Sequence, residues 1–287
     1  MDVDSAQTLL SRSGISRNNL ILSSLQKFSQ GPTPELRTQV SSGRKGLRKS
    51  GTTIVAIRYV NGVLMAGDRR MSNGYSHDDE AIKVHPVGYF SLYGAAGTVS
   101  YIQELLETLR NTTETFERLV GEPIFIDGQA EIMKNIMREN AKELAFLNLL
   151  LEYSSSPVLA GWDPENGSGD IFYFDESGGF YETGSVGAVA IGSGGDYARV
   201  VLEERWRNDM NLQEAIWLVV RAIFRAAGID LFTAPPQQHP VFICSASAMG
   251  LRIVEPTKAL KIARSIERED VLRRKDREKL VFYKEEG

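Results

Sequence analysis

The stretch of sequence that decides the fold is GTTIVAIRYVNGVLMAGDRR, which covers residues 51–70. Apart from one arginine, residues 52–60 are β-branched, apolar or aromatic, as in a buried strand. Asn61-Gly62 is the strongest short-range signal for a hairpin turn, and residues 63–68 supply the return strand. We therefore predict a hairpin centred on Asn61-Gly62, which places Thr52 opposite Met71 and Asp68 roughly 10 Å away along the return strand.

Outward from this hairpin, the chain alternates between groups of strands and pairs of helices. Further strands are predicted within 82–93, 157–161, 171–174, 180–183, 186–191 and 241–254, and helices at about 99–119, 129–147, 197–207 and 212–227. Antiparallel strands with helices in blocks indicate an α+β fold. Two antiparallel sheets, each covered by a helix pair, would bury every apolar face, so we expect a four-layer αββα sandwich.

Charge and composition divide the chain into three parts. Residues 1–51 carry eight Lys or Arg and three Asp or Glu, whereas the whole chain has a net charge of −4. A basic leader therefore precedes an acidic body, and that body argues against nucleic acid as the main partner. We expect a weakly structured propeptide at 1–51, a single domain at 52–256 and a charged tail, solvated helix or frayed coil, at 257–287.

Composition also limits the chemistry and the location that we expect. No run approaches the roughly 18 apolar residues that cross a bilayer, and the N-terminus is acidic where a secretory signal is basic, so we expect a cytoplasmic protein. The one cysteine, Cys244, lies in an apolar run and is predicted to be a buried core residue. Three histidines far apart in sequence offer little material for a metal centre or for Ser/Cys–His catalysis.

Thr52 is the candidate nucleophile. A threonine hydroxyl needs a base nearby, and a free α-amine on the same residue, with a pKa of roughly 7.7–8.0, can serve. This chemistry requires removal of everything before Thr52, and Gly51 leaves the preceding carbonyl unshielded for attack by the hydroxyl in cis. By itself Gly-Thr-Thr is a weak signal, because threonine is common at the start of a strand.

Asp68 and Lys83 each have a structural and a functional interpretation. Asp68 could simply be a polar hairpin end, and Lys83, between Ile82 and Val84 in a predicted strand, could extend its amine to solvent. A lysine within an apolar strand otherwise needs a partner. In the functional interpretation Lys83 pairs with Asp68 beside the Thr52 hydroxyl, where its positive charge favours the alkoxide.

Taken together, these residues resemble proteasome β subunits, especially the bacterial type. The resemblance spans about 51–254 and rests on the following segments in order: Thr52 to Ala56, Asn61-Gly62, Met65 to Arg70, Lys83-Val84, Ala96 to Thr98, Leu159 to Asp163, Ala190 to Gly194 and Asp230 to Thr233. Each segment is a weak motif alone, but their joint order and spacing are specific. The resemblance implies an N-terminal-nucleophile hydrolase fold and a threonine endopeptidase that exposes Thr52 by cutting between Gly51 and Thr52.

The resemblance also implies a role for each matching position. Thr52 is the nucleophile with its own amine as base, Asp68 and Lys83 form a supporting ion pair, and Arg70 gives structural support. The backbone N–H of Gly97 binds the oxyanion, a kind of donor whose removal costs about 10²–10³ in rate. The residues that hold and tune the amine are Ser193, Asp230 and Thr233. A substrate pocket lined by Met71, Ala95 and Val99 suggests an apolar P1 preference.

The implied assembly is a homo-oligomeric β ring, heptameric, stacked with α-type subunits and fed by an ATP-dependent unfoldase ring. Its substrates are unfolded polypeptides, and the resemblance implies no metal, no organic cofactor, no nucleic acid and no membrane partner. The sequence departs from the family pattern at Gly195, where a second serine is usual, and at Ala234, where glycine is usual. The segment between Asp68 and Lys83 is also one residue shorter.

Three alternatives stay open at this level. The chain could be a non-catalytic structural β-type ring subunit that retains its leader. It could be a subunit of the related ATP-dependent protease with six-membered rings, although those chains usually remove only Met. The run from Val186 to Tyr197 could be a dinucleotide-binding turn, although it lacks the full GxGxxG pattern.

Overall fold

A computed structural model describes residues 51–72, 77–146, 154–184 and 186–285. Within these residues the chain forms two five-stranded antiparallel sheets, a short two-stranded ribbon and five helices. The first sheet contains, in spatial order, β10 (Ala188–Gly192), β1 (Thr53–Tyr59), β2 (Gly62–Gly67), β11 (Phe242–Ser247) and β12 (Gly250–Ile253). The second contains β5 (Val84–Val87), β6 (Ser91–Gly97), β7 (Ser155–Asp163), β8 (Ser168–Phe174) and β9 (Phe180–Glu182).

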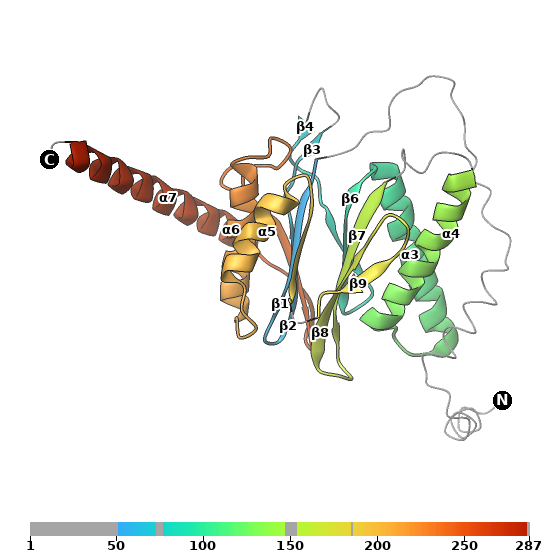
Figure 1. Ribbon diagram of the computed structural model, residues 1–287. Coiled ribbons are helices and arrows are strands. Elements are labelled where there is room, and N and C mark those ends of the chain that lie inside the picture. The colour runs from blue at the N-terminus through green and yellow to red at the C-terminus, as the bar shows by residue number, and fades with distance from the viewer. Residues whose placement is uncertain (1–50, 73–76, 147–153, 185, 286–287) are drawn as a thin grey trace. The chain divides into compact units, whose positions relative to one another are not determined.

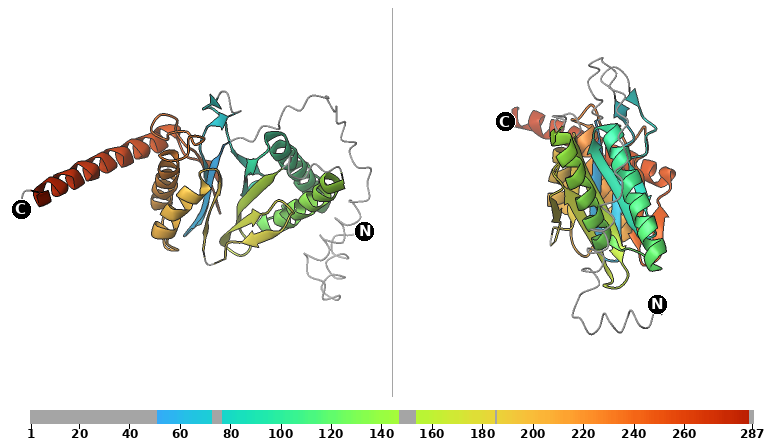
Figure 2. Two further views of the ribbon diagram at one scale, coloured as in Figure 1. Left: turned by 45° about the horizontal axis from the view of Figure 1, so that its top comes forward. Right: turned by 90° about the vertical axis from the view of Figure 1, so that its right-hand side faces the viewer.

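Helices cover the outer face of each sheet, so the predicted four-layer αββα sandwich is confirmed (Figure 1). The helices are α3 (Val99–Val120), α4 (Ile126–Phe146), α5 (Gly195–Arg205), α6 (Leu212–Ala227) and α7 (Pro256–Glu285). Figure 2 shows from a second direction that α3 and α4 lie against the second sheet. The helices α5 and α6 pack on the first sheet, where α6 contacts β1 and β2. None of the helices in the described residues combines the length and the apolar character needed to span a membrane.

The alternation of side chains along β1 separates two hydrophobic cores. Val55 and Ile57 pack with α5, α6 and the start of α7, whereas Ile54 and Ala56 pack against the second sheet. Every one of these side chains is almost completely buried. A strand with apolar residues on both faces is what a central position between two layers requires, because successive side chains point to opposite faces. The apolar run in the sequence, which only Arg58 interrupts, therefore identifies β1 as an interior strand.

The predicted register of the opening hairpin was wrong by two residues. Tyr59 pairs with Gly62, so the turn is Val60-Asn61 and Asp68 lies opposite Thr53 instead of three residues from Thr52. Gly62 is instead a strand residue that pairs with Ser247 of β11, and a Cβ at this position would collide with the Ala246 carbonyl oxygen. Close packing between β2 and β11 thus uses the glycine that the sequence analysis assigned to the turn.

Three other features differ from the sequence expectation. Lys83 immediately precedes β5 and is not within a strand, and the ribbon of β3 (Met71–Ser72) and β4 (His77–Asp78) was not predicted. The region expected to be a charged tail contains α7, whose first part is anchored by buried Ala259, Ala263 and Ile266.

Candidate active site

Thr52 lies one residue before β1, and it is almost completely buried. Because the chain is intact, its nitrogen is a peptide N–H, and it donates to Ser193 Oγ at 3.2 Å. Gly192, with a φ of 92°, passes so close to the Thr52 carbonyl that any side chain there would collide with it. The Gly-rich connection between β10 and α5 thus brings the serine to the nucleophile candidate. Since β10 pairs antiparallel with β1, it does not belong to the βαβ unit of a dinucleotide site.

Asp68 and Lys83 form a buried ion pair, as the functional interpretation predicted. Lys83 Nζ lies 2.7 Å from Asp68 Oδ1, and the two side chains are 8% and 0% exposed. Burial lowers the pKa of Lys83 below the usual lysine range, and the adjacent Asp68 carboxylate opposes that shift. Lys83 therefore carries its charge in a place where water contributes little to stabilising it.

Three backbone N–H groups complete the surroundings of the Asp68 carboxylate. Oδ1 accepts from the N–H of Thr53 at 2.8 Å, and Oδ2 accepts from the N–H of Arg70 at 2.8 Å and of Ala234 at 3.0 Å. With Lys83, the carboxylate therefore has four donors. Such a fully satisfied buried carboxylate is held in one orientation, which fixes the direction of the Lys83 amine.

Lys83 also reaches the peptide bond that precedes Thr52. Its Nζ donates to the Gly51 carbonyl oxygen at 3.1 Å, in addition to its bond with Asp68. A cation at this oxygen withdraws electrons from the carbonyl carbon and stabilises negative charge that develops on the oxygen. A Cβ on Gly51 would collide with Phe232, so the backbone at this position has room for glycine alone.

A second set of hydrogen bonds connects Thr52 with the residues after α6. Ser193 Oγ donates to Asp230 Oδ2 at 2.7 Å, and Thr233 Oγ1 donates to the same oxygen at 2.7 Å. The other carboxylate oxygen, Oδ1, accepts from the N–H of Phe232 at 3.0 Å. Thr233 Oγ1 also lies 2.6 Å from Thr53 Oγ1. These bonds join residues separated by 37 and 180 positions in the sequence.

Six of the seven predicted catalytic residues belong to this connected network of hydrogen bonds. They are Thr52, Asp68, Lys83, Ser193, Asp230 and Thr233, with Thr53 as the link between the two halves. The seventh, Gly97, ends β6 with a φ of 139° and pairs with Ser155 of β7. The three residues predicted to line the pocket lie on separate elements: Met71 on β3, Ala95 on β6 and Val99 at the start of α3.

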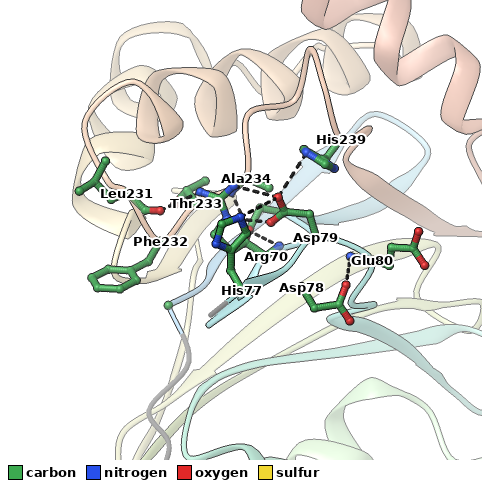
Figure 3. Close-up of polar contacts among 12 residues, drawn as sticks. Arg70, His77, Asp78, Asp79, Glu80, Leu231, Phe232, Thr233, Ala234 and His239 are labelled. Atoms are coloured by element: carbon green, nitrogen blue, oxygen red, sulfur yellow. Dashed lines mark hydrogen bonds and ion pairs between the residues drawn. The ribbon is translucent and has the colours of Figure 1, made fainter. Parts of the chain in front are cut away.

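Arg70, which the resemblance implied to be structural support, forms an anchor beside the network with partners that were not predicted, namely Asp79, His239 and His77 (Figure 3). Arg70 makes two parallel bonds to Asp79, from Nε to Oδ1 at 2.7 Å and from Nη2 to Oδ2 at 2.8 Å. His239 Nε2 lies 3.2 Å and His77 Nε2 3.7 Å from Oδ2. The Arg70 guanidinium, and to a smaller extent the two histidines, hold the pKa of Asp79 below its usual range.

This anchor connects the ribbon with the segment that carries Asp230. Arg70 donates a further bond to the Leu231 carbonyl at 2.9 Å, so one guanidinium contacts both segments. The only sequence signal was the charged run around Asp79, which does not reveal that His239 approaches it. No group of three or more His, Cys, Asp or Glu side chains in the described part of the chain is placed to hold a metal ion.

Comparisons with known proteins identify a family that this chain resembles. The model of the family described as "Proteasome subunit" matches residues 48–236. A protein named "Proteasome subunit beta" from Acidimicrobium ferrooxidans is 37% identical over 187 residues, which are 65% of this chain and 66% of that protein. Proteins of the same name from Jonesia denitrificans and Streptomyces griseus are 34% and 32% identical, covering 65% and 75% of this chain and 60% and 76% of their own lengths.

The family match covers well over half of the chain, and the observed fold agrees with it. This chain spans 66% and 60% of the lengths of the first two relatives, which is less than two thirds of each. The family-model match begins just before Thr52 and ends just after the segment that carries Asp230 and Thr233, so it includes every predicted site residue. The chain belongs to the proteasome subunit family and is a β subunit of the bacterial type.

Proposed function

We propose that this chain is a catalytic β subunit, a threonine endopeptidase of a proteasome core particle that becomes active when residues 1–51 are removed. The observation that carries the proposal is the position of Lys83 Nζ, which contacts both Asp68 Oδ1 and the Gly51 carbonyl oxygen. This cation lies where the peptide bond before Thr52 would have to be polarised for cleavage. A purely structural subunit has no need of a buried charge at that carbonyl.

The proposed activation is an acyl shift within the chain. Thr52 Oγ attacks the Gly51 carbonyl carbon, the carbon–nitrogen bond breaks, and the hydroxyl proton ends on the Thr52 nitrogen. Lys83 stabilises the negative charge on the Gly51 oxygen during the attack. Water then hydrolyses the resulting ester, which releases residues 1–51 with a terminal carboxylate and leaves Thr52 with a free amine and a free hydroxyl.

The same groups then cleave substrate polypeptides. The Thr52 amine takes the hydroxyl proton while Oγ attacks the scissile carbonyl, and the proton passes to the departing amine. Water hydrolyses the ester to complete the cycle. Ser193 Oγ, 3.2 Å from the Thr52 nitrogen and itself bonded to Asp230, orients the amine. We assign the oxyanion donor to the backbone N–H of Gly97 and an apolar P1 pocket to Met71, Ala95 and Val99.

The assembly is part of the proposal. The relatives are named as proteasome subunits beta, which supports assembly into a core particle. We propose a homo-oligomeric β ring that is heptameric and stacks with α-type subunits. An ATP-dependent unfoldase ring would deliver unfolded polypeptides to the chamber, in the cytoplasm. We propose that 52–256 forms the peptidase domain and that the charged segment 257–287 is an addition to it.

The competing proposal is a structural β subunit that retains its leader. Both proposals are tested by expressing the full chain and three variants, Thr52→Ala, Thr52→Ser and Thr113→Val, with the α-type partner. Thr113 is a matched control, because it is a buried threonine on α3 whose hydroxyl makes no hydrogen bond within the described residues. Intact mass reports the leader, and hydrolysis of fluorogenic peptides reports activity.

We expect the wild type, Thr52→Ser and Thr113→Val to lose residues 1–51 and to cleave peptides. Thr52→Ala should keep its leader and lose activity, because its side chain has no oxygen to attack the carbonyl. Wild-type rings that retain Gly51 and cleave nothing would support the structural alternative. Full peptidase activity in Thr52→Ala would refute the proposed mechanism.

A further inference from the structure

Thr53 forms bonds to both halves of the site, although it is not the nucleophile. It is fully buried, and its N–H donates to Asp68 Oδ1 at 2.8 Å. Its hydroxyl lies 2.6 Å from Thr233 Oγ1. Thr53 therefore contacts Asp68, whose carboxylate pairs with Lys83, and it also contacts Thr233, whose hydroxyl bonds Asp230. Both connections are short and shielded from water.

Counting protons assigns the direction of each bond in this chain. Thr233 has one hydroxyl proton, which it donates to Asp230 Oδ2 at 2.7 Å, so Thr53 must be the donor in the bond to Thr233. Ser193 likewise donates to Asp230 Oδ2 at 2.7 Å, in preference to the Thr52 carbonyl at 3.4 Å. The hydroxyl protons of Ser193 and Thr233 thus both point to the Asp230 carboxylate. A lone pair of Ser193 Oγ faces the Thr52 nitrogen.

The surrounding backbone is shaped to accommodate this pair of hydroxyls. Gly194 lies so close that a Cβ there would collide with Thr53 Oγ1 and would lie 2.7 Å from Thr233 Oγ1. It would also lie 3.0 Å from Ala226 Cβ, at the end of α6. The absence of a side chain at Gly194 therefore leaves room for the two oxygens to meet. This packing is independent of the hydrogen-bond geometry and supports the same site.

We propose that Thr53 is a positioning residue, whose hydroxyl holds Thr233 and Asp230 so that Ser193 orients the Thr52 amine. The inference rests on the proposed function, since it concerns the amine that cleavage liberates. The hydroxyl bond attaches β1 directly to the segment after α6, across 180 positions of sequence. It also strengthens the bond from Thr233 to Asp230, because hydrogen bonds in a chain polarise one another.

The test compares Thr53→Val with Thr53→Ser and Thr53→Cys in assembled, processed rings. Valine keeps the shape and removes the hydroxyl, serine keeps the hydroxyl, and cysteine keeps a weak donor. We expect Thr53→Val to lower kcat about tenfold, which corresponds to about 1.4 kcal/mol, with an unchanged KM. Serine should restore kcat to near the wild-type value, and cysteine should fall between serine and valine. Thr113→Val is the control for loss of a buried hydroxyl.

The pH profile separates a positioning role from a general loss of packing. Without the Thr53 donor, Thr233 neutralises less of the Asp230 charge, so the Thr52 amine becomes more basic. The acidic limb of kcat should therefore move to higher pH in Thr53→Val and stay in place in Thr53→Ser and Thr113→Val. If Thr53→Val does not assemble, kcat and its pH profile are measured on Thr53→Cys, for which smaller changes in the same directions are expected.

The outcomes also distinguish this inference from the proposed function. If Thr52→Ala is inactive but Thr53→Val matches the wild type in kcat and in its pH profile, only the role of Thr53 is overturned. If Thr52→Ala remains active, the proposed function itself fails. A double-mutant cycle with Thr233→Val adds a third measure, since two residues that act through one bond should show non-additive effects on kcat.

Discussion

The two halves of the network around Thr52 are built over very different distances in the sequence. The first half, Asp68 and Lys83, lies within 31 positions of Thr52 and carries opposite charges in contact with one another. The second half, Ser193, Asp230 and Thr233, lies at least 141 positions away and uses hydroxyls around one carboxylate. The first half lies on segments that follow β1 closely in the chain, whereas the second half comes from distant segments that only the complete sandwich brings to Thr52. We expect the first half to dominate charge stabilisation and the second to dominate geometry.

The largest effect is expected for Asp68→Asn. The change leaves Lys83 buried without a counterion and presents an amide to backbone N–H groups that need acceptors. Breaking a buried ion pair in this way costs about 3–5 kcal/mol, and loss of the oriented cation should reduce peptidase activity by at least about a hundredfold. Chemical denaturation and peptide hydrolysis measure the two effects. A stable, active variant would show that charge is not what the first half contributes.

A smaller effect is expected for Asp230→Asn in the second half. The side chain stays close in shape, but the bonds from Ser193, Thr233 and the Phe232 N–H lose their charge-assisted character. We expect a loss of about 1.5–3 kcal/mol in stability and up to about a hundredfold in kcat through misplacement of the amine. Equal or larger losses than in Asp68→Asn would reverse the proposed ranking of the two halves.

Disruption of the anchor formed by Arg70 and Asp79 should have a still smaller effect. Asp79→Asn removes half of the charge-assisted pairing with Arg70, for an expected cost of about 1–2 kcal/mol in the free energy of unfolding. The matched control is Asp78→Asn. The exposed side chain of Asp78 bonds only the Glu80 N–H among the contacts described, so we expect a change within about 0.5 kcal/mol.

The pH dependence of stability gives a second test of the Asp79 pairing. Because the folded pKa of Asp79 is lowered, its contribution is present above about pH 4 and is lost as pH falls through that folded pKa. The difference in stability between wild type and Asp79→Asn should therefore shrink in acid.

The smallest and most specific effect concerns how the contribution of Lys83 to stability depends on pH. Burial lowers its folded pKa, so between that value and about 10.4 the unfolded chain binds more protons than the folded one. The contribution of Lys83 to stability should therefore rise with pH in this window, while activity falls because the neutral amine no longer favours the Thr52 alkoxide. The measurement is the pH dependence of the stability difference between wild type and Lys83→Met. A difference that falls with rising pH would contradict the assigned direction.

The sequence alone determined the αββα fold, the nucleophile candidate and the residues of both halves. Apolar runs with period two for strands and 3.6 for helices are written in consecutive residues, so local physics is enough to identify them. The order of the segments that carry Asp68, Lys83, Ser193 and Asp230 was likewise visible, because a resemblance depends on sequence and not on contacts.

Tertiary structure alone decided which atoms meet. Packing of Gly62 against β11 moved the hairpin turn to Val60-Asn61 and brought Thr53 opposite Asp68. The bond between Thr53 and Thr233 and the approach of His239 to Asp79 join segments more than 150 positions apart, and no local pattern encodes such meetings. They form because burial of both faces of β1 fixes the layers, and the polar groups left at the end of the strand must then find partners in those layers.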